Sequence, residues 1–335
     1  MKVFALLFVL LGFLNFAAAE VPVLTWVGQF PKEQAGPVVE LFNSHYATEA
    51  GFKVVYNSSD AAIADILAGK VDPQFDIVHM KDADMLNTLA VKGLSEPLRT
   101  TELKAWPTHL KDSRNMWVGL LKRSRIIYYN SELVSPNEVQ TYESLGDAKF
   151  KGKLCVRQKK AQYTIGLHSF LLGVWGEQKT AQVLKSWAVN SEALPLIEKD
   201  LEGVIAGIEN GNCLVGIANT YYYMRHLRAH PNTKVKAVIP NQNDIGAHVN
   251  VDGVAILNSS ANKDAAQAFA AWLMSDAAQM ELSKITDKHP VSPHVTSPEL
   301  LQVFGTFKDN SSFDLNNITD LKERASAIAT EQGLK

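Results

Sequence analysis

This chain contains little cysteine, and neither positive nor negative charge is in large excess. Only two cysteines, Cys155 and Cys213, occur among 335 residues, and 33 Lys and Arg are balanced by 35 Asp and Glu. This balance excludes the strongly basic composition that is typical of nucleic-acid-binding proteins. The sequence also lacks a low-complexity tract, and its hydrophobic fraction of 46% is that of an ordinary globular protein. We therefore expect a folded protein that binds no nucleic acid.

The motifs of the common hydrolytic and phosphate-binding enzymes are also missing. We find no Gly-x-Ser-x-Gly elbow, no His-Glu-x-x-His zinc motif, no glycine-rich phosphate loop and no carboxylate dyad. The nine histidines are scattered, and only His226 and His230 have a helical i, i+4 spacing. Because this pair lacks the glutamate of a zinc-protease motif, we interpret it as a solvated helix face. We expect that the protein is not an enzyme.

The one long apolar run lies at the amino terminus. Lys2 is followed by apolar residues from Val3 to Phe16 and by three alanines before Glu20. This pattern predicts a signal peptide over residues 1–19 that is removed on export, and no later segment approaches the length of a membrane span. Neither cysteine is next to the cleavage site, so we expect no lipid anchor there. We expect the mature protein to be free in the periplasm.

The two cysteines have two open interpretations. An oxidising compartment favours a Cys155–Cys213 disulfide. Each cysteine is close in sequence to one of the tyrosine segments described below, so such a bridge would join two candidate binding segments. The alternative is two buried free thiols, since the distance between them cannot be read from the sequence.

Apolar spacing in the first part of the chain alternates between strand and helix. We expect strands at 21–27, 52–56 and 75–78, and helices at 37–50, 61–68 and 83–91. Alternation of this kind predicts a mostly parallel sheet with helices on both faces.

A second alternating block follows two β-rich stretches in the middle of the chain. These stretches lie at 117–121 and 125–130, and the block contains strands at 153–156 and 213–217 with helices at 165–175, 180–187 and 201–209. An apolar stretch at 251–257 then precedes a long helix at 263–282.

The length and the two β-rich crossings together predict two α/β lobes around a hinged cleft. Roughly 300 residues remain after removal of the signal peptide, which is more than one hydrophobic core usually serves. We assign 20–122 plus 245–296 to the first lobe and 123–244 plus 297–335 to the second lobe. A ligand is expected in the cleft between them.

A run of tyrosines is the most informative local feature. Tyr221 and Tyr222 follow the strand expected at 213–217, at the carboxyl end where open α/β sheets hold their ligands. A phenol ionises only near pH 10, but a highly charged hard cation displaces that proton and takes the phenolate oxygen as a ligand. The pattern therefore favours a ferric iron site.

Tyr163 lies beyond the strand that carries Cys155, so we expect it to converge with Tyr221 and Tyr222 at one edge of a parallel sheet. Three phenolates would neutralise one ferric ion, and water, an anion or a first-lobe residue would complete the coordination. Arg123 and Arg125 could hold such an anion by forked hydrogen bonds. A second interpretation treats the tyrosines as core or cleft residues and the arginines as surface charges.

Four separated segments resemble the ferric-iron-binding periplasmic proteins of ABC importers. They are Lys122-Arg123-Ser124-Arg125-Ile126-Ile127-Tyr128-Tyr129-Asn130, Leu154-Cys155-Val156-Arg157 with Tyr163 six positions after the arginine, Ala218-Asn219-Thr220-Tyr221-Tyr222, and His248-Val249-Asn250-Val251-Asp252-Gly253-Val254-Ala255-Ile256. Their order and approximate spacing agree through nearly the whole mature chain.

The resemblance implies a type II solute-binding protein, a monomer that delivers Fe(III) to an inner-membrane ABC permease. It implies that Tyr163, Tyr221 and Tyr222 are the metal ligands and that Arg123 supports a synergistic anion such as carbonate. Asn219 is a further candidate for a supporting contact. Tyr223 has no counterpart that we can assign, and Tyr128 and Tyr129 are interpreted as strand packing.

The chain also departs from the family pattern. Family members often provide a His or a Tyr from the loop after the first strand, whereas this loop contains Gln29 and Phe30. Gln29 is at most a weak or supporting contributor, so no first-lobe ligand is evident. The segment before Tyr163 carries Lys159 and Lys160 where the family usually has serines, which favours an accompanying anion or a ferric chelate. The remaining alternative is a receptor for a small organic ligand that uses the tyrosines as an aromatic box.

Overall fold

The computed structural model describes residues 21–70, 72–305 and 308–335. The signal peptide expected at 1–19 lies outside these residues. Within the described ranges, no helix is both long enough and apolar enough to cross a membrane.

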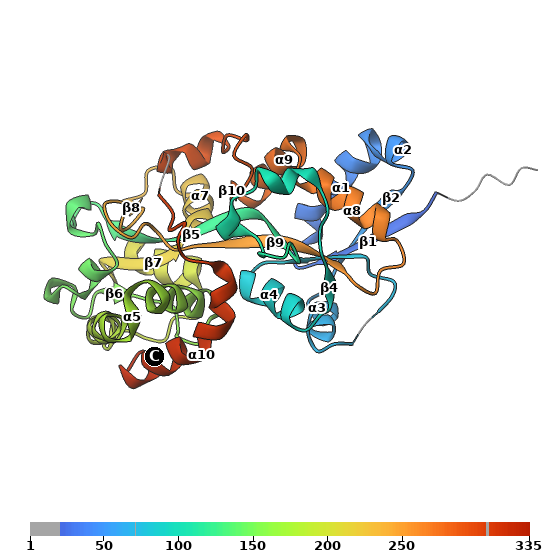
Figure 1. Ribbon diagram of the computed structural model, residues 1–335. Helices are drawn as coiled ribbons and strands as arrows, with labels where there is room; N and C mark the ends of the chain where they lie inside the picture. The colour runs from blue at the N-terminus through green and yellow to red at the C-terminus, as the bar shows by residue number, and fades with distance from the viewer. Residues whose placement is uncertain (1–20, 71, 306–307) are drawn as a thin grey trace, which may run out of the picture.

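One end of the molecule, which we call the first lobe, is built on a sheet whose central strands are apolar and buried (Figure 1). Its strands, in spatial order, are β2 (Lys53–Ser58), β1 (Val23–Gly28), β3 (Ile77–Met80) and β9 (Val249–Leu257), with β4 (Ser95–Glu96) paired to β9. The expected strands are thus present, with ends that differ by a few residues.

Helices cover both faces of this sheet (Figure 1). They are α1 (Lys32–His45), α2 (Ala47–Ala50), α3 (Asp60–Leu67), α4 (Ala83–Val91), α8 (Lys263–Leu273) and α9 (Asp276–Thr286). The side chains of Ser59 and Asp82 accept backbone hydrogen bonds at the starts of α3 and α4, which fixes where these two helices begin.

The single helix expected at 263–282 is wrong: the structure has two helices there. The chain leaves α8 at Met274, and Ser275 begins α9 by accepting a hydrogen bond from the Ala278 N–H. Because a serine cap followed by an acidic first turn is a strong helix start, this local signal interrupts the apolar periodicity. The break turns α9 toward the other end of the molecule.

The second lobe is built on the other half of the sheet. Its strands are β5 (Val118–Asn130), β7 (Val215–Asn219), β6 (Leu154–Cys155) and β8 (Val235–Val238). The two β-rich stretches expected at 117–121 and 125–130 are one continuous strand of 13 residues. Its first half pairs with β9 and its second half with β7 and β8, so β5 runs through both lobes.

The parallel pairing expected in the first part of the chain is confirmed for β1, β2 and β3, but it does not extend to the two crossing strands. Strands β1 and β2, β1 and β3, and β6 and β7 are parallel, whereas every pairing made by β5 or β9, including the pairing between them, is antiparallel. The two crossing strands run against their neighbours because the chain passes from one lobe to the other along β5 and returns along β9.

The helices of the second lobe are α5 (Gln162–Ser191), α6 (Ala206–Glu209), α7 (Thr220–Ala229) and α10 (Ile318–Glu331), with a π-helical turn at Asp200–Ile205. Gly176, with φ 76°, divides α5 into the two helical segments that the sequence predicts. Helix α10 packs along α5 and also contacts α4 of the first lobe.

Shorter elements connect these parts. They are β10 (His289–Pro290), which pairs with β5, and the 3₁₀ turns Thr101–Lys104, Thr108–Leu110, Pro136–Glu138, Glu143–Gly146, Ala148–Phe150, Glu299–Phe304 and Leu315–Asn317.

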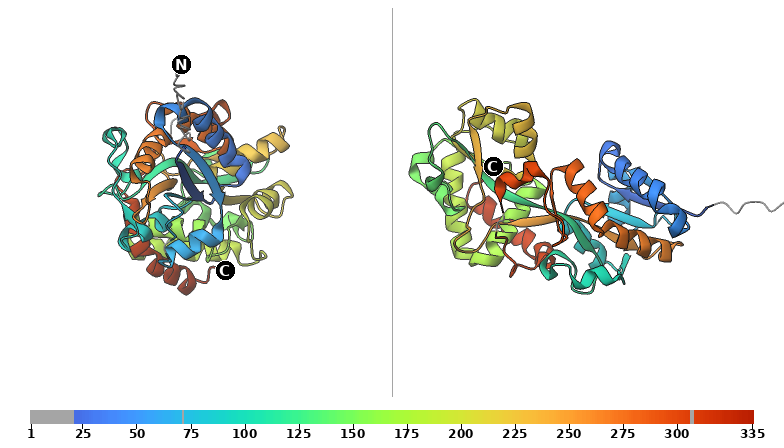
Figure 2. Two further views of the ribbon diagram at one scale, coloured as in Figure 1. Left: turned by 90° about the vertical axis from the view of Figure 1, so that its right-hand side faces the viewer. Right: turned by 90° about the horizontal axis from the view of Figure 1, so that it is seen from above.

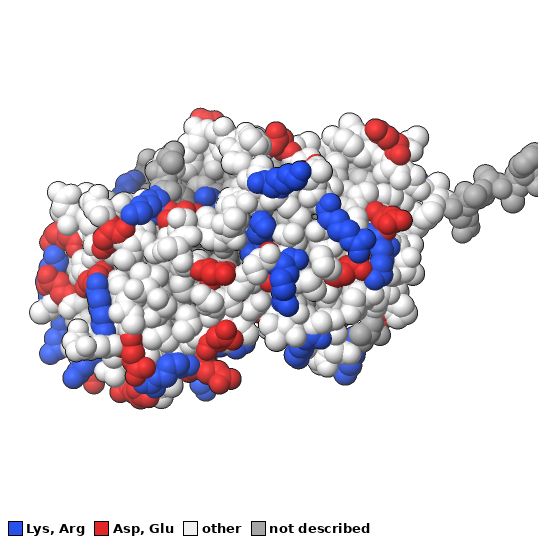
Figure 3. All heavy atoms as spheres, viewed as in Figure 1, with Lys and Arg blue, Asp and Glu red and all other residues white. Residues whose placement is uncertain are grey.

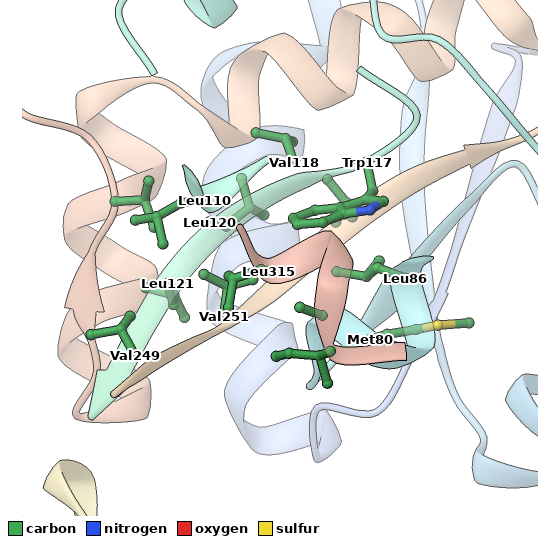
Figure 4. Close-up of a cluster of buried hydrophobic side chains, with 14 of the residues drawn as sticks. Met80, Leu86, Leu110, Trp117, Val118, Leu120, Leu121, Val249, Val251 and Leu315 are labelled. Atoms are coloured by element: carbon green, nitrogen blue, oxygen red, sulfur yellow. The ribbon is translucent and has the colours of Figure 1, made fainter. Parts of the chain in front are cut away.

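The crossing of β5 and β9 is packed as a hydrophobic core. Val118 and Leu121 on β5 and Val251 on β9 are fully buried, with Leu86 of α4 and Leu315 beside them (Figure 4). Two further views show the elongated molecule and the two bodies that this crossing joins (Figure 2). The sequence limits of the lobes given above remain our proposal.

A disulfide lies in the second lobe. Cys155 at the end of β6 is bonded to Cys213 just before β7, with Cα atoms 5.8 Å apart. Gly207 of α6 lies against both sulfurs, since a Cβ there would be 3.0 Å from the Cys155 Sγ and 3.3 Å from the Cys213 Sγ. The bridge therefore joins the end of β6 to the segment just before β7, and these are the two strands that precede the tyrosine segments.

Both signs of charge are interspersed on the face that Figure 3 shows, and neither gathers into a continuous patch there.

Gly253 provides a test of the crossing. A Cβ at this position of β9 would lie 2.3 Å from the Val118 carbonyl oxygen and 2.8 Å from Leu86 Cδ1. Since a backbone atom cannot yield without separating the strands, we expect Gly253→Ala to lower the free energy of unfolding by about 1–3 kcal/mol. Urea denaturation followed by circular dichroism measures this change.

Gly36 of α1 supplies the control, because a Cβ there meets no atom within 4 Å. We expect Gly36→Ala to leave the free energy of unfolding unchanged or to raise it by about 0.5–1 kcal/mol, because alanine favours the helix over glycine and the new methyl group meets open space. Equal effects of the two substitutions would contradict the close approach of β5 and β9.

Candidate tyrosine site

The three tyrosines lie at the starts of two helices. Tyr163 is in the first turn of α5, which follows β6, and Tyr221 and Tyr222 are in the first turn of α7, which follows β7. Because β6 and β7 are parallel neighbours, both helices begin at the same edge of the sheet. The second-lobe topology therefore brings together residues that are far apart in the sequence.

The tyrosine side chains contact one another. The Tyr221 hydroxyl interacts with those of both Tyr163 and Tyr222, and the ring centroids of Tyr221 and Tyr222 are 4.3 Å apart. Tyr221 is only 4% exposed, and the other two are half-buried. The three phenol side chains thus form one compact group at the edge of the second-lobe sheet where α5 and α7 begin.

Burial holds the phenols of Tyr163 and Tyr221 in their neutral form. It raises the pKa of Tyr221 well above its usual value. It also raises the pKa of Tyr163, because the effect of burial is larger than the opposing effect of the nearby Arg123 charge. Three adjacent phenolates would also repel one another. The oxygens therefore become anionic only when a strong cation arrives to balance them.

Arg123 is buried between two carboxylates. Its Nη1 is 2.8 Å from Asp252 Oδ1 and its Nη2 is 3.1 Å from Asp82 Oδ2, and the side chain is almost fully buried. The guanidinium carbon lies 4.9 Å from the centroid of the Tyr163 ring. The interpretation of Arg123 as a surface charge is therefore wrong, and both ends of its fork already bind carboxylates.

Arg125 is also buried, so the surface interpretation is wrong for it as well. Its Nη1 is 3.1 Å from both carboxylate oxygens of Asp200, and its Nη2 donates to the Ile217 carbonyl oxygen at 3.2 Å. Arg157 pairs with the same Asp200 at 3.3 Å. Arg125, Arg157 and Asp200 thus form a second ion cluster within the second lobe.

Asn219 and Gln29, the two candidates for supporting contacts to the tyrosines, have different surroundings. Asn219 Nδ2 lies 3.3 Å from the Tyr221 oxygen, and its carbonyl oxygen accepts a hydrogen bond from Tyr128 Oη at 2.7 Å. Gln29 uses both ends of its amide within the first lobe: it donates to Asp60 at 3.0 Å and accepts from the Lys81 N–H at 3.1 Å. Asn219 therefore contacts a candidate ligand, whereas these bonds of Gln29 are made elsewhere.

The remaining tyrosines of these segments pack in the second-lobe core. Tyr128 is fully buried and Tyr129 is 7% exposed, as expected for strand packing. Tyr223 meets the Tyr128 ring edge-on with centroids 5.8 Å apart. It belongs to the core and does not join the group formed by Tyr163, Tyr221 and Tyr222.

Sequence reasoning did not identify the first-lobe residues that meet the tyrosines. Lys288 Nζ lies 5.2 Å from the centroid of the Tyr221 ring and forms an ion pair with Asp252. His79 stacks on Phe30 with ring centroids 3.6 Å apart, and its Nε2 is 3.7 Å from Asp252 Oδ2. The available signal was Asp252 itself, a charged residue within a mostly apolar strand.

A second contact between the lobes lies beside Lys288. Both terminal nitrogens of Arg228 in α7 bind the Asp287 carboxylate, with Nη1 2.7 Å from Oδ2. Asp287 has a left-handed conformation with φ 59° at the end of α9. The adjacent residues Asp287 and Lys288 therefore both reach from the first lobe to the tyrosine helix.

The interpretation of His226 and His230 as a solvated face is wrong for His226. This side chain is 5% exposed and lies 2.9 Å from Thr233 Oγ1 and 3.3 Å from Glu209 Oε2. Among the residues that the structure describes, no group of three or more His, Cys, Asp and Glu is arranged to hold a metal ion. The tyrosine group is the candidate site that remains for a hard cation.

Comparison with protein families is decisive about ancestry. Residues 42–303 match the family model described as "Bacterial extracellular solute-binding protein". The chain belongs to this family.

Similar members of the family have names that concern iron. This solute-binding protein is 29% identical over 312 residues to Iron uptake protein A2 of Synechocystis sp. (strain ATCC 27184 / PCC 6803 / Kazusa), covering 88% of this chain and 89% of that protein. It is 26% identical over 324 residues to the Major ferric iron-binding protein of Neisseria meningitidis serogroup B, covering 91% of each.

Solved structures share its fold. "Trichodesmium (IdiA) (FutA) in complex with iron and citrate ligands" has a TM-score of 0.85 and 28% identity, covering 93% of this chain and all of that one. "Apo FutA2 from Synechocystis PCC6803" has a TM-score of 0.82 and 26% identity, covering 94% and 100%. The expectation of a two-lobe type II periplasmic solute-binding fold is thereby confirmed.

The pKa of Asp82 leads to a pH prediction. Burial raises this pKa to about 6, because its effect is larger than the opposing effects of the Arg123 charge and of the hydrogen bond from the Asp84 N–H. A carboxyl whose pKa is higher in the folded state contributes stability below its unfolded pKa near 4, and this contribution is lost as the pH rises through about 6. Asp82→Asn removes the titration and keeps the helix cap.

We therefore expect the stability of Asp82→Asn relative to the unsubstituted protein to increase between about pH 4 and pH 7, by up to about 3 kcal/mol. Urea denaturation at a series of pH values measures this difference. Asp65→Asn, on the exposed side of α3, is the control. A difference that does not vary with pH would contradict the raised pKa of Asp82.

Proposed function

We propose that this protein is the periplasmic receptor of an ABC importer and that it binds ferric iron through the phenolates of Tyr163, Tyr221 and Tyr222. The observation that carries the proposal is the contact among these three side chains at the starts of α5 and α7. Three phenolates and one ferric ion sum to zero charge, which removes the cost of holding either partner alone in a buried position.

The order in which the two lobes bind the iron is also part of the proposal. All three tyrosines belong to the second lobe, so iron binds there first, and closure of the first lobe then excludes water. The Arg228–Asp287 ion pair is one contact that such closure makes. Release to the inner-membrane permease requires protonation of the phenolates, reduction of the iron or contact with the permease, since each of these weakens the iron–phenolate bonds.

The accompanying ligand is a further part of the proposal. Relatives with similar sequences are named for iron uptake or ferric iron binding, and one similar structure contains iron and citrate. These names support Fe(III) as cargo, bound with an anion such as carbonate or as a ferric chelate. A small organic ligand held by the tyrosine rings is the alternative function, and the absence of a colour change on adding iron would favour it.

The proposal also includes a binding role without catalysis, export to the periplasm and a monomeric state. The chain belongs to a family of solute-binding proteins, which supports a binding role without catalysis. The family is extracellular in bacteria, which supports export to the periplasm. We propose a monomer, since one chain provides all three tyrosines.

Tyrosine-to-phenylalanine substitutions test the ligand set. We expect Tyr163→Phe, Tyr221→Phe and Tyr222→Phe each to weaken ferric iron binding at least about 100-fold, because each removes one anionic oxygen from the metal. Titration of metal-stripped protein with ferric salt, followed by the visible charge-transfer absorption of ferric phenolate, measures the loss.

Tyr129→Phe is the matched control, since it removes a phenol oxygen from the second-lobe core. It should bind iron as the unsubstituted protein does, and all four variants should keep the native circular dichroism spectrum. If the three site variants bind iron normally, the site assignment is wrong.

A further inference from the structure

A small cavity lies inside the second lobe, between α5 and the sheet. Arg125 of β5 and Ile217 of β7 line it from the sheet, and Thr164, Leu167 and His168 line it from the first two turns of α5. Its volume is about 10 Å³, which holds one particle of the size of a water molecule. No tyrosine is among the described residues that line it.

Two buried nitrogens of this wall have no hydrogen-bond partner among the described residues. They are Arg125 Nε and His168 Nδ1, and both side chains are 2% exposed. The rest of the Arg125 fork is used, because Nη1 binds Asp200 and Nη2 donates to the Ile217 carbonyl oxygen. Since a buried polar group without a partner costs free energy, a ligand that hydrogen-bonds to both nitrogens would be stabilised in the cavity.

The charges of the wall favour an anion as this ligand. Arg125, Arg157 and Lys159 line the cavity, and no Asp or Glu is among the described residues that do so. The two guanidinium groups share one carboxylate, that of Asp200. One positive charge of this ion cluster is therefore not neutralised within it. An anion beside a partly buried excess charge is attracted more strongly than it would be in water.

The size of the cavity and the chemistry of its wall decide which anion fits. Carbonate, phosphate and carboxylates have several heavy atoms and are too large for about 10 Å³. A halide ion is a single atom that needs donors and no acceptor, and the wall also contains the apolar side chains of Leu167 and Trp187. Burial and the Arg125 charge lower the pKa of His168 to about 3, so its imidazole is neutral and donates from Nδ1 in one of its two tautomers.

We propose that this cavity is a halide site, in which one chloride ion accepts hydrogen bonds from Arg125 Nε and His168 Nδ1. The ion neutralises the excess charge of the cluster formed by Arg125, Arg157 and Asp200, and it links α5 to β5. The proposal does not rest on the iron function, because the site lies within one lobe, uses no phenol oxygen and is filled without a metal.

Thermal unfolding of the metal-stripped protein tests halide binding in solution. The melting temperature is measured in sodium chloride, sodium bromide and sodium gluconate at equal ionic strength, since gluconate is too large for the cavity. A ligand that binds the folded state alone raises the melting temperature as its concentration rises. We expect chloride and bromide each to raise it by about 2–4 °C relative to gluconate.

Three variants show whether the rise comes from this cavity. His168→Leu removes one donor at nearly constant volume, and we expect it to reduce the rise to below about 1 °C. Lys159→Met removes a cation that lines the cavity and should also reduce the rise, which keeps the test valid if His168→Leu folds poorly. Lys160→Met removes the neighbouring lysine, which is exposed, and should leave the rise unchanged. Circular dichroism checks the fold of each variant.

Crystals of the protein grown in sodium bromide identify the occupant. Anomalous scattering at the bromine edge should show a peak in the cavity, within hydrogen-bonding distance of Arg125 Nε and His168 Nδ1. An ordered water molecule in place of bromide would overturn the halide site, since water would use the His168 nitrogen as an acceptor. A rise in melting temperature that is equal in His168→Leu, Lys159→Met and the unsubstituted protein would overturn it as well.

Discussion

The rest of the site depends on the buried ion cluster around Asp252. This carboxylate lies on β9 at the crossing of the two lobes, where it binds Arg123 from β5 and Lys288 from the segment before β10. The charges of these partners hold the pKa of Asp252 well below its usual range in spite of burial. The Asp252 carboxylate therefore positions both Arg123 at the Tyr163 ring and Lys288 at the Tyr221 ring. The crossing between the lobes and the candidate site share this ion cluster.

The tyrosine group shows how burial and charge are opposed in such a site. Burial favours neutral phenols, and the pKa values of Tyr163 and Tyr221 are raised accordingly. The surrounding cations favour phenolates, but they are partly neutralised by Asp82 and Asp252. The balance leaves phenols that are protonated when no metal is present and that ionise when a trivalent cation binds, which is what reversible capture requires.

Local signals in the sequence predicted most elements and the meeting of the tyrosines. The strands before Tyr163 and Tyr221 are recognisable from their apolar residues, and parallel pairing of β6 and β7 is enough to bring the two helix starts together. The antiparallel crossing of β5 and β9 was not predictable in this way, because pairing direction depends on how the chain passes between lobes. The break at Ser275 was not predicted, because the apolar stripe continues across it and a single capping residue is the weaker of the two signals.

The first-lobe half of the site was missed for a different reason. Lys288 and Asp287 lie more than 60 positions after the tyrosine pair, in a segment that reads as an ordinary turn. Only the pairing of β10 with β5 and the left-handed backbone of Asp287 bring them to α7. Contacts between lobes are set by the hinge, and a hinge leaves no periodic pattern in the sequence.

The central claim is that one ferric ion binds to three tyrosine oxygens of the second lobe, and a crystal structure of the protein grown with ferric citrate tests it most directly. Anomalous scattering at the iron edge locates the metal independently of the protein atoms. The account predicts a single iron peak within bonding distance of the hydroxyl oxygens of Tyr163, Tyr221 and Tyr222. An iron peak elsewhere, or one that contacts none of these oxygens, would contradict it.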